Sequence, residues 1–186
     1  MQKFKYYSCI LIFIFFGIHK TIGQTKESQN LNLSIGYGIT VPYDETDING
    51  SGFFAHGEYI FNLKKWIDLR PYAGLILTYE DSNNEIYKTT SKALLIGGKG
   101  RISAPIPWVA PYLELGIGAS IGKFETITPL TDLSKNGVLM HIPFSIGLEL
   151  GPKHNFDLGF TYYYQPAVEQ FSGAIAFGIS IPMKKA

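Results

Sequence analysis

The pairing of a histidine with a serine is the most familiar chemistry that the sequence offers. His141 and Ser145 lie four positions apart in a segment, 138–149, that alternates apolar and polar residues. Alternation with period two predicts a β-strand, in which four residues at ~3.3 Å each separate these side chains by roughly 13 Å. A general base must lie within hydrogen-bond reach of its nucleophile. The spacing therefore argues against a serine hydrolase, and we predict no catalytic residue in the chain.

A second candidate is a calcium loop that begins at Glu45, Asp47, Asn49 and Gly50. The position that needs a bidentate glutamate holds His56, and the flanking segments are predicted strands rather than helices. The chain has one cysteine. It is Cys9, in an N-terminal apolar run, so disulfide and thiol chemistry are not expected. We predict neither a specific metal site nor a cofactor, and we expect His56 and His141 to fill polar interior positions.

A set of charged residues is more informative because all of its members lie on the same side of the alternation. The set is Glu58, Arg70, Lys99, Arg101, Glu114, Glu149 and Asp157. Each lies close to one of the short connections, either where a predicted strand ends or where the next one begins. Because the short connections are all at one end of the fold, these residues should meet there. Unpaired charges in a narrow interior are costly, so we predict a paired network that plugs this interior. The functional alternative is a charged gate or a proton path.

The strands that position these charges have two unlike faces, and the segment 111–122 shows this best. One face is apolar, and the other is mostly glycine and serine with one tyrosine and one carboxylate. The apolar face is Pro111, Leu113, Leu115, Ile117, Ala119 and Ile121; the other is Tyr112, Glu114, Gly116, Gly118, Ser120 and Gly122. Side chains this small suit a crowded interior, so the apolar face is predicted to be the outer one, as in a transmembrane β-barrel strand.

Eight segments repeat this alternation, with Leu95 as an inward apolar exception. They cover residues 31–41, 53–61, 69–79, 90–102, 111–122, 138–149, 156–164 and 171–181. The connections after the first, third and fifth are longer and acidic, and 124–137 is predicted to be a loop. Those after the second, fourth and sixth are short. An even strand number and this alternation of connections predict an all-β fold: an eight-stranded antiparallel up-and-down transmembrane β-barrel.

The N-terminus has the order of a secretory signal. Basic residues precede an apolar run, 9–18, which is far shorter than the ~20 residues of a spanning helix, and small residues follow up to Gly23. We predict a signal peptide over residues 1–23 and one barrel domain over 24–186. Removing 1–23 takes away three lysines and leaves 13 basic and 15 acidic residues. This balance gives no reason to expect a nucleic-acid partner.

With its predicted signal, eight alternating segments, the Pro111-Tyr-x-x-Leu-Gly-x-Gly118 run and an apolar last strand, the chain resembles the single-domain, eight-stranded outer-membrane β-barrel proteins of Gram-negative bacteria. The resemblance implies localisation in the outer membrane, contact with its lipid, insertion by the barrel-assembly machinery and a monomeric state. Such barrels include structural anchors, adhesins and lipid-modifying enzymes, so the resemblance leaves the activity open.

We expect a non-enzymatic barrel with a side-chain-plugged lumen that acts in envelope structure or in surface interactions through acidic loops. Two alternatives remain: an outer-membrane acyltransferase or deacylase, and a soluble lipocalin-like carrier with its faces reversed. The predicted external loops could also bind divalent cations weakly. Their charged residues are Asp44, Glu45, Asp47, Glu80, Asp81, Glu85, Glu125, Asp132 and Glu169, with Lys88, Lys123 and Lys135.

Overall fold

The computed structural model of the chain describes residues 30–44, 47–80 and 87–183. The predicted signal peptide, the predicted first mature residue Gln24, and the loop residues Glu45, Asp81 and Glu85 lie outside this range. Within it, no helix has the length and apolar character needed to cross a membrane.

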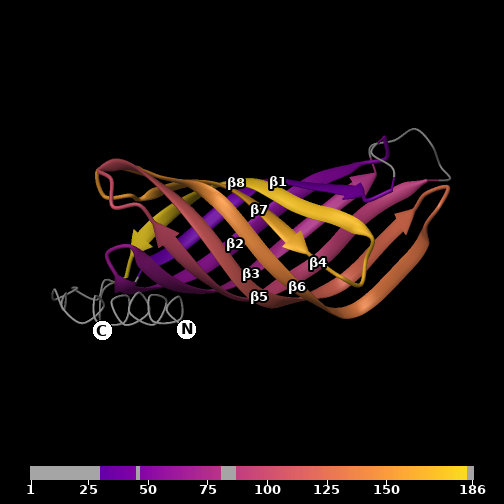
Figure 1. Cartoon of the computed structure of the whole chain (residues 1–186), viewed down its shortest axis with the longest axis horizontal. Helices are drawn as coiled ribbons and strands as arrows, with labels where there is room; N and C mark the ends of the chain where they lie inside the picture. The colour runs from indigo at the N-terminus through magenta and orange to yellow at the C-terminus, as the bar shows by residue number, and fades with distance from the viewer. Residues whose placement is uncertain (1–29, 45–46, 81–86, 184–186) are drawn as a thin grey trace, which may run out of the picture.

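The described chain forms eight strands that close into one antiparallel barrel (Figure 1). The strands are β1 (Asn30–Pro42), β2 (Gly50–Lys64), β3 (Ile67–Glu80), β4 (Lys88–Ser103), β5 (Trp108–Ile127), β6 (Asp132–Gly151), β7 (Phe156–Tyr164) and β8 (Gln170–Pro182). Each pairs with its neighbours in the sequence, and β8 pairs with β1 from Pro42↔Gln170 to Asn30↔Pro182. The predicted fold class is confirmed.

The barrel has two unlike ends, which we name the turn end and the loop end. The turn end, at the left of Figure 1, carries the connections 65–66, 104–107 and 152–155. The loop end carries the connections between β1 and β2, β3 and β4, β5 and β6, and β7 and β8. At the turn end, Gly151 has a φ of 94°, a conformation that glycine adopts without steric cost as the chain leaves β6.

The prediction of a loop over 124–137 is wrong. β5 continues to Ile127 and β6 begins at Asp132, with pairing that runs unbroken from Gly122↔Gly137 to Ile127↔Asp132. The alternation also continues, because Phe124 and Thr126 are fully buried. Their neighbours on the outer face are Lys123 and Glu125, which suit water rather than lipid. The β5–β6 hairpin thus reaches well beyond the β7–β8 connection, as Figure 1 shows.

The faces of the strands lie as the alternation predicts. On β5, Leu113, Leu115 and Ile117 point outward and are 56–62% exposed, whereas the inward Glu114 and Ser120 are at most 2% exposed. The same apolar outer face recurs on the other strands. This arrangement is the opposite of a soluble carrier, which would expose its polar face and line its cavity with apolar side chains.

The interior also holds a group of apolar residues, among them the Leu95 that the alternation had placed inward. A cluster of buried side chains fills the lumen towards the loop end: Phe54, Tyr72, Ile76, Ala93, Leu95, Phe124, Tyr163, Val168 and Ala174. Val168 belongs to the β7–β8 connection and is fully buried, so this connection packs into the barrel. The lumen is therefore layered, with charged residues near the turn end and an aromatic and aliphatic layer beyond them.

Candidate functional site

The seven charged residues selected from the sequence lie together inside the barrel, in the half nearest the turn end. They occupy inward positions on β2 to β7: Glu58, Arg70, Lys99, Arg101, Glu114, Glu149 and Asp157. Six of them are at most 8% exposed, and the Glu149 side chain is 13% exposed. The pairing register places Arg101 opposite Glu114, a pair of opposite charge. It also places Glu149 opposite Asp157, two carboxylates that Arg101 bridges.

Arg101 lies at the centre of this charge network. Its Nε donates to Glu114 Oε1 at 2.6 Å, and its Nη1 donates to Glu149 Oε1 at 2.8 Å and Asp157 Oδ2 at 2.5 Å. The guanidinium also stacks on the Tyr112 ring, with 3.5 Å from Cζ to the ring centroid. The rigid, planar fork of arginine can satisfy several carboxylates at once, which a lysine in this position could not do.

Lys99 and Arg70 join the remaining carboxylates to the network. Lys99 Nζ lies 2.7 Å from Glu114 Oε2 and 2.5 Å from Glu58 Oε1. Arg70 donates through Nη1 to Glu58 Oε2 at 3.1 Å, and through Nη2 to Glu149 Oε1 at 3.1 Å. All seven predicted residues are thus brought into one connected set of ion pairs.

The sequence analysis missed one member, Asp68, which accepts a 2.8 Å hydrogen bond from Arg70 Nη2. It had begun the third strand at Leu69, whereas β3 begins at Ile67, so the inward position two residues before Arg70 was overlooked. His56 also touches the network, with Nδ1 3.2 Å from Glu58 Oε1. Three cations therefore face five carboxylates, and Asp68 and Glu149 are the two nearest to the open turn end.

A second chain of polar side chains lies on the loop-end side of the charge network. It includes a contact of His141 that the sequence analysis did not anticipate. His141 Nδ1 lies 2.7 Å from Ser120 Oγ on the neighbouring strand, and His141 Nε2 lies 2.5 Å from the Tyr72 hydroxyl. Gln165 Nε2 donates to Ser120 Oγ at 2.7 Å. Ser145, the serine considered from the sequence, bonds instead to Thr161. The true histidine–serine contact crosses strands, which spacing along one strand cannot reveal.

Hydroxyl and amide groups fill the lumen at the loop end. Gln170 Oε1 accepts hydrogen bonds from Thr89 and Thr126, and Gln170 Nε2 donates to Ser91 Oγ at 2.6 Å. Further towards the tip of the loop end, Thr128 and Thr131 of the β5–β6 connection donate to Asp44 Oδ2 at 2.6 and 2.9 Å. The bond from Thr128 is the main cause that lowers the pKa of Asp44 below its ordinary value. These bonds tie the tip of the hairpin to the end of β1.

The free space between the charge network and the apolar cluster is small. It has a volume of about 20 Å³, enough for about one water molecule. His56 Nε2, Arg70 Nε and the Tyr163 hydroxyl are buried without a hydrogen-bond partner among the described residues. The part of the chain that the structure describes has no group of three or more metal-binding side chains. Weak cation binding by the loops stays a prediction.

The close packing around the second polar chain can be tested at Gly118. A methyl group there would overlap the Tyr72 hydroxyl, His141 Nε2 and the Ile96 carbonyl. We expect Gly118→Ala to lower the free energy of unfolding by about 1–3 kcal/mol, measured by urea unfolding in lipid vesicles. Gly98→Ala is the matched control on β4, because no described residue other than its two chain neighbours comes within 4 Å of the added methyl group. Equal effects of the two substitutions would contradict the tight contact.

No protein-family model and no curated protein sequence matches the chain, but solved structures match its fold. The barrel is similar to Neisserial surface protein A, with a TM-score of 0.61 and 12% identity over 83% of this chain and 97% of that one. It is also similar to the N-terminal β-barrel domain of OprF from Pseudomonas aeruginosa, with a TM-score of 0.51 and 11% identity over 83% and 98% of the two chains. The chain therefore has the fold of the small outer-membrane β-barrels that its sequence resembles.

Proposed function

We propose that the protein is a non-enzymatic, integral outer-membrane β-barrel whose lumen is plugged by its own side chains. Its role would lie in envelope structure or in surface interactions through the acidic residues of its loop end. The observation that carries the proposal is the combination of an apolar outer face with a lumen crossed by the charge network, above which a space of only about 20 Å³ separates it from the apolar cluster.

The outer surface supports insertion in a membrane. Apolar side chains cover it between the two ends, and Trp66 and Trp108 lie exposed at the turn end, where an interfacial aromatic belt is expected. In a bacterial barrel the short turns face the periplasm, which would place the loop end outside the cell. Lipid of the outer membrane and the barrel-assembly machinery are the partners that this proposal requires, and a monomer satisfies it.

The contact between Ser120 and His141 invites the enzyme alternative, and its surroundings argue against it. Both side chains are fully buried inside the barrel. Ser120 Oγ already lies within hydrogen-bond distance of both His141 and Gln165. A lipid-modifying enzyme must bring an acyl chain to its nucleophile, and the outer wall of the barrel separates Ser120 from lipid. We therefore assign this pair to the packing of the lumen.

Conductance across a planar bilayer tests the plugged lumen. We expect the purified wild-type protein to give no steady openings after insertion, because Arg101 and its carboxylate partners cross the lumen. Insertion must be shown independently, for example by protease protection of the reconstituted protein. Steady openings of large conductance in the wild type would contradict the plug and favour a channel.

A further inference from the structure

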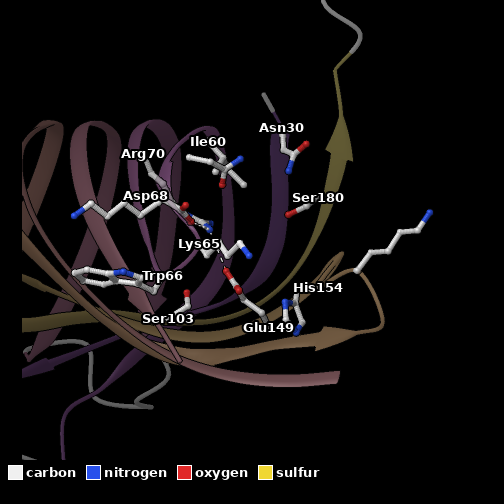
Figure 2. Close-up of a pocket in the computed structure, with 13 residues that line it drawn as sticks. Asn30, Ile60, Lys65, Trp66, Asp68, Arg70, Ser103, Glu149, His154 and Ser180 are labelled. Carbon is white, nitrogen blue, oxygen red and sulfur yellow. Dashed lines mark hydrogen bonds and ion pairs between the residues drawn. The ribbon is translucent and has the colours of Figure 1, made fainter. Parts of the chain in front are cut away.

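The two ends of the barrel differ in what they leave without a partner. At the turn end, Figure 2 shows a cavity of about 470 Å³ whose charged floor is already satisfied, because Arg70 donates to both Asp68 and Glu149. At the loop end, one edge of β6 has no neighbouring strand. It is the longest unpaired edge among the described strands.

The open edge of β6 covers residues 132–141. Along this whole stretch β6 pairs with β5 on one side. On the other side, pairing with β7 begins only at Ile142↔Tyr164, because the nine-residue β7 ends there. The β7–β8 connection turns into the lumen, where Val168 is fully buried. Among the described residues, nothing therefore bonds to the backbone of 132–141 on the β7 side.

The pairing with β5 determines which backbone groups point to the open edge. Antiparallel pairs alternate between those that exchange hydrogen bonds and those that do not. Pairing with β5 is interrupted at Pro143, which has no N–H, so Pro143 holds a bonding position. Thr131 holds another, since its carbonyl accepts from Thr128 N at 2.7 Å. Odd-numbered residues of β6 thus bond to β5, and the open edge presents the N–H and C=O groups of Asp132, Ser134, Asn136, Val138 and Met140.

The end of this edge nearest the membrane has the greatest need of a partner. Val138 and Met140 continue the apolar outer face, opposite Ile121 and Ala119 of β5, and are 69% and 55% exposed. Backbone groups that border lipid gain more from a protein partner than groups in water, because no water replaces the missing hydrogen bond. A further strand is the element that satisfies a row of such groups.

The other face of the hairpin carries a cation without a partner. Leu133 packs against the apolar cluster, and Lys135, two residues along the same face, is exposed. Lys135 has no ion pair among the described residues, whereas Lys123 pairs with Glu125 at 2.9 Å. Opposite charges on directly opposed residues stabilise neighbouring strands. An acidic side chain on an added strand therefore fits the position opposite Lys135.

From this edge we propose that the loop end binds an extended segment of another protein, which adds to β6 as an antiparallel strand and places an acidic side chain opposite Lys135. It rests on the function proposed above, because the outward position of the loop end makes the edge accessible to proteins outside the cell. Main-chain hydrogen bonds would supply the affinity, and the contact with Lys135 would supply selectivity.

A second copy of the chain in the same membrane does not fit this edge. Two such copies are related by an axis along the membrane normal, from which barrel strands tilt by roughly 35–45°. Their β6 strands would cross at roughly 70–90°, twice that tilt, instead of lying antiparallel. The segment that fits the edge therefore belongs to a different protein.

The probe for this site is a fluorescein-labelled peptide, Thr-Val-Thr-Glu-Thr-Val-Thr-amide. Its alternation places the glutamate between two valines on the face of Lys135. We expect a saturable rise in fluorescence anisotropy when the full-length folded protein in octyl glucoside is added to it. N-methylation of the two central threonines removes the donors that face β6 and should weaken the binding at least about tenfold. Equal binding of the methylated peptide would overturn the proposal.

Asn136→Pro tests the edge from the side of the protein. It removes an N–H that points to the open edge and leaves the bonds to β5 in place, so binding should weaken about five- to tenfold. Asn136→Ala is the matched control: it keeps the N–H and should leave the affinity within about twofold. Equal affinities of the two variants would contradict pairing at this edge.

A charge exchange keeps the test decisive if Asn136→Pro does not fold. Lys135→Glu should weaken binding of the peptide about threefold, and a peptide with lysine in place of its glutamate should recover it. No saturable binding to the wild-type protein would overturn the proposal, and so would a dimer in detergent that Lys135→Glu dissociates. The bilayer conductance is measured separately, so a closed lumen without peptide binding would reject the added strand and keep the plugged barrel.

Discussion

Replacing Arg101 by alanine should reduce the free energy of unfolding of the barrel by about 3–5 kcal/mol, the usual cost of removing one partner from a buried ion pair. Arg101 bonds to Glu114, Glu149 and Asp157, and its guanidinium covers the Tyr112 ring. The substitution leaves these carboxylates buried with too few cations, and only Lys99 and Arg70 remain to pair with them. Urea unfolding of the protein in lipid vesicles measures the loss.

Two further variants decide whether the loss comes from the network. Adding Glu114→Gln to Arg101→Ala should recover part of the stability, because the second substitution removes one of the carboxylates left short of a partner. Lys123→Ala removes a cation that is 53% exposed and paired with Glu125 at 2.9 Å, and should cost no more than about 1 kcal/mol. Strictly additive effects of the two network substitutions would argue against a coupled network.

The second large effect is expected on the outer face. Ile117→Arg should destabilise the folded barrel in a bilayer by about 2–4 kcal/mol, because Ile117 lies on the lipid-facing side of β5, well inside the strand. Vesicle-folding yield and urea unfolding in the same lipid measure this effect.

The control for this experiment is the same substitution at a site exposed to water. Leu130 is 84% exposed in the β5–β6 connection, beyond the apolar band, and Ile117 is 62% exposed. Both side chains are open to their surroundings, so only the surrounding medium distinguishes them. Leu130→Arg should leave folding nearly unchanged. Comparable effects at the two positions would mean that water surrounds both, which is incompatible with a membrane-spanning barrel.

Period-two alternation was sufficient to predict the number of strands, their inward and outward faces and the closed barrel. The alternation is informative because a one-residue shift in register would exchange the two faces of a whole strand. Every residue of a strand must therefore follow the same pattern, and each segment shows it repeatedly. The same logic placed Glu114 and Arg101 inside the barrel. Their approach to the other charges then followed from the narrow lumen of eight strands.

The remaining features depend on where strands end and on which residues of different strands face each other. Neither can be read from the alternation within a single segment. Asp68 was missed because the start of β3 was placed two residues late, and strand ends carry the weakest pattern. The contact between Ser120 and His141 is set by the register of β5 against β6. The extension of these two strands past Phe124 was hidden because charged residues replace apolar ones on the outer face once lipid gives way to water.

The unequal lengths of the strands have a mechanical consequence. β5 and β6 have 20 residues each, whereas β7 has nine, and β8 meets β1 along its full 13 residues. Interstrand hydrogen bonds increase with the paired length, so the two seams beside β7 are the weakest in the wall. The seam that joins the two ends of the chain is longer and stronger. Under tension or partial unfolding, the cylinder should therefore open first along β7 rather than along the seam between β1 and β8.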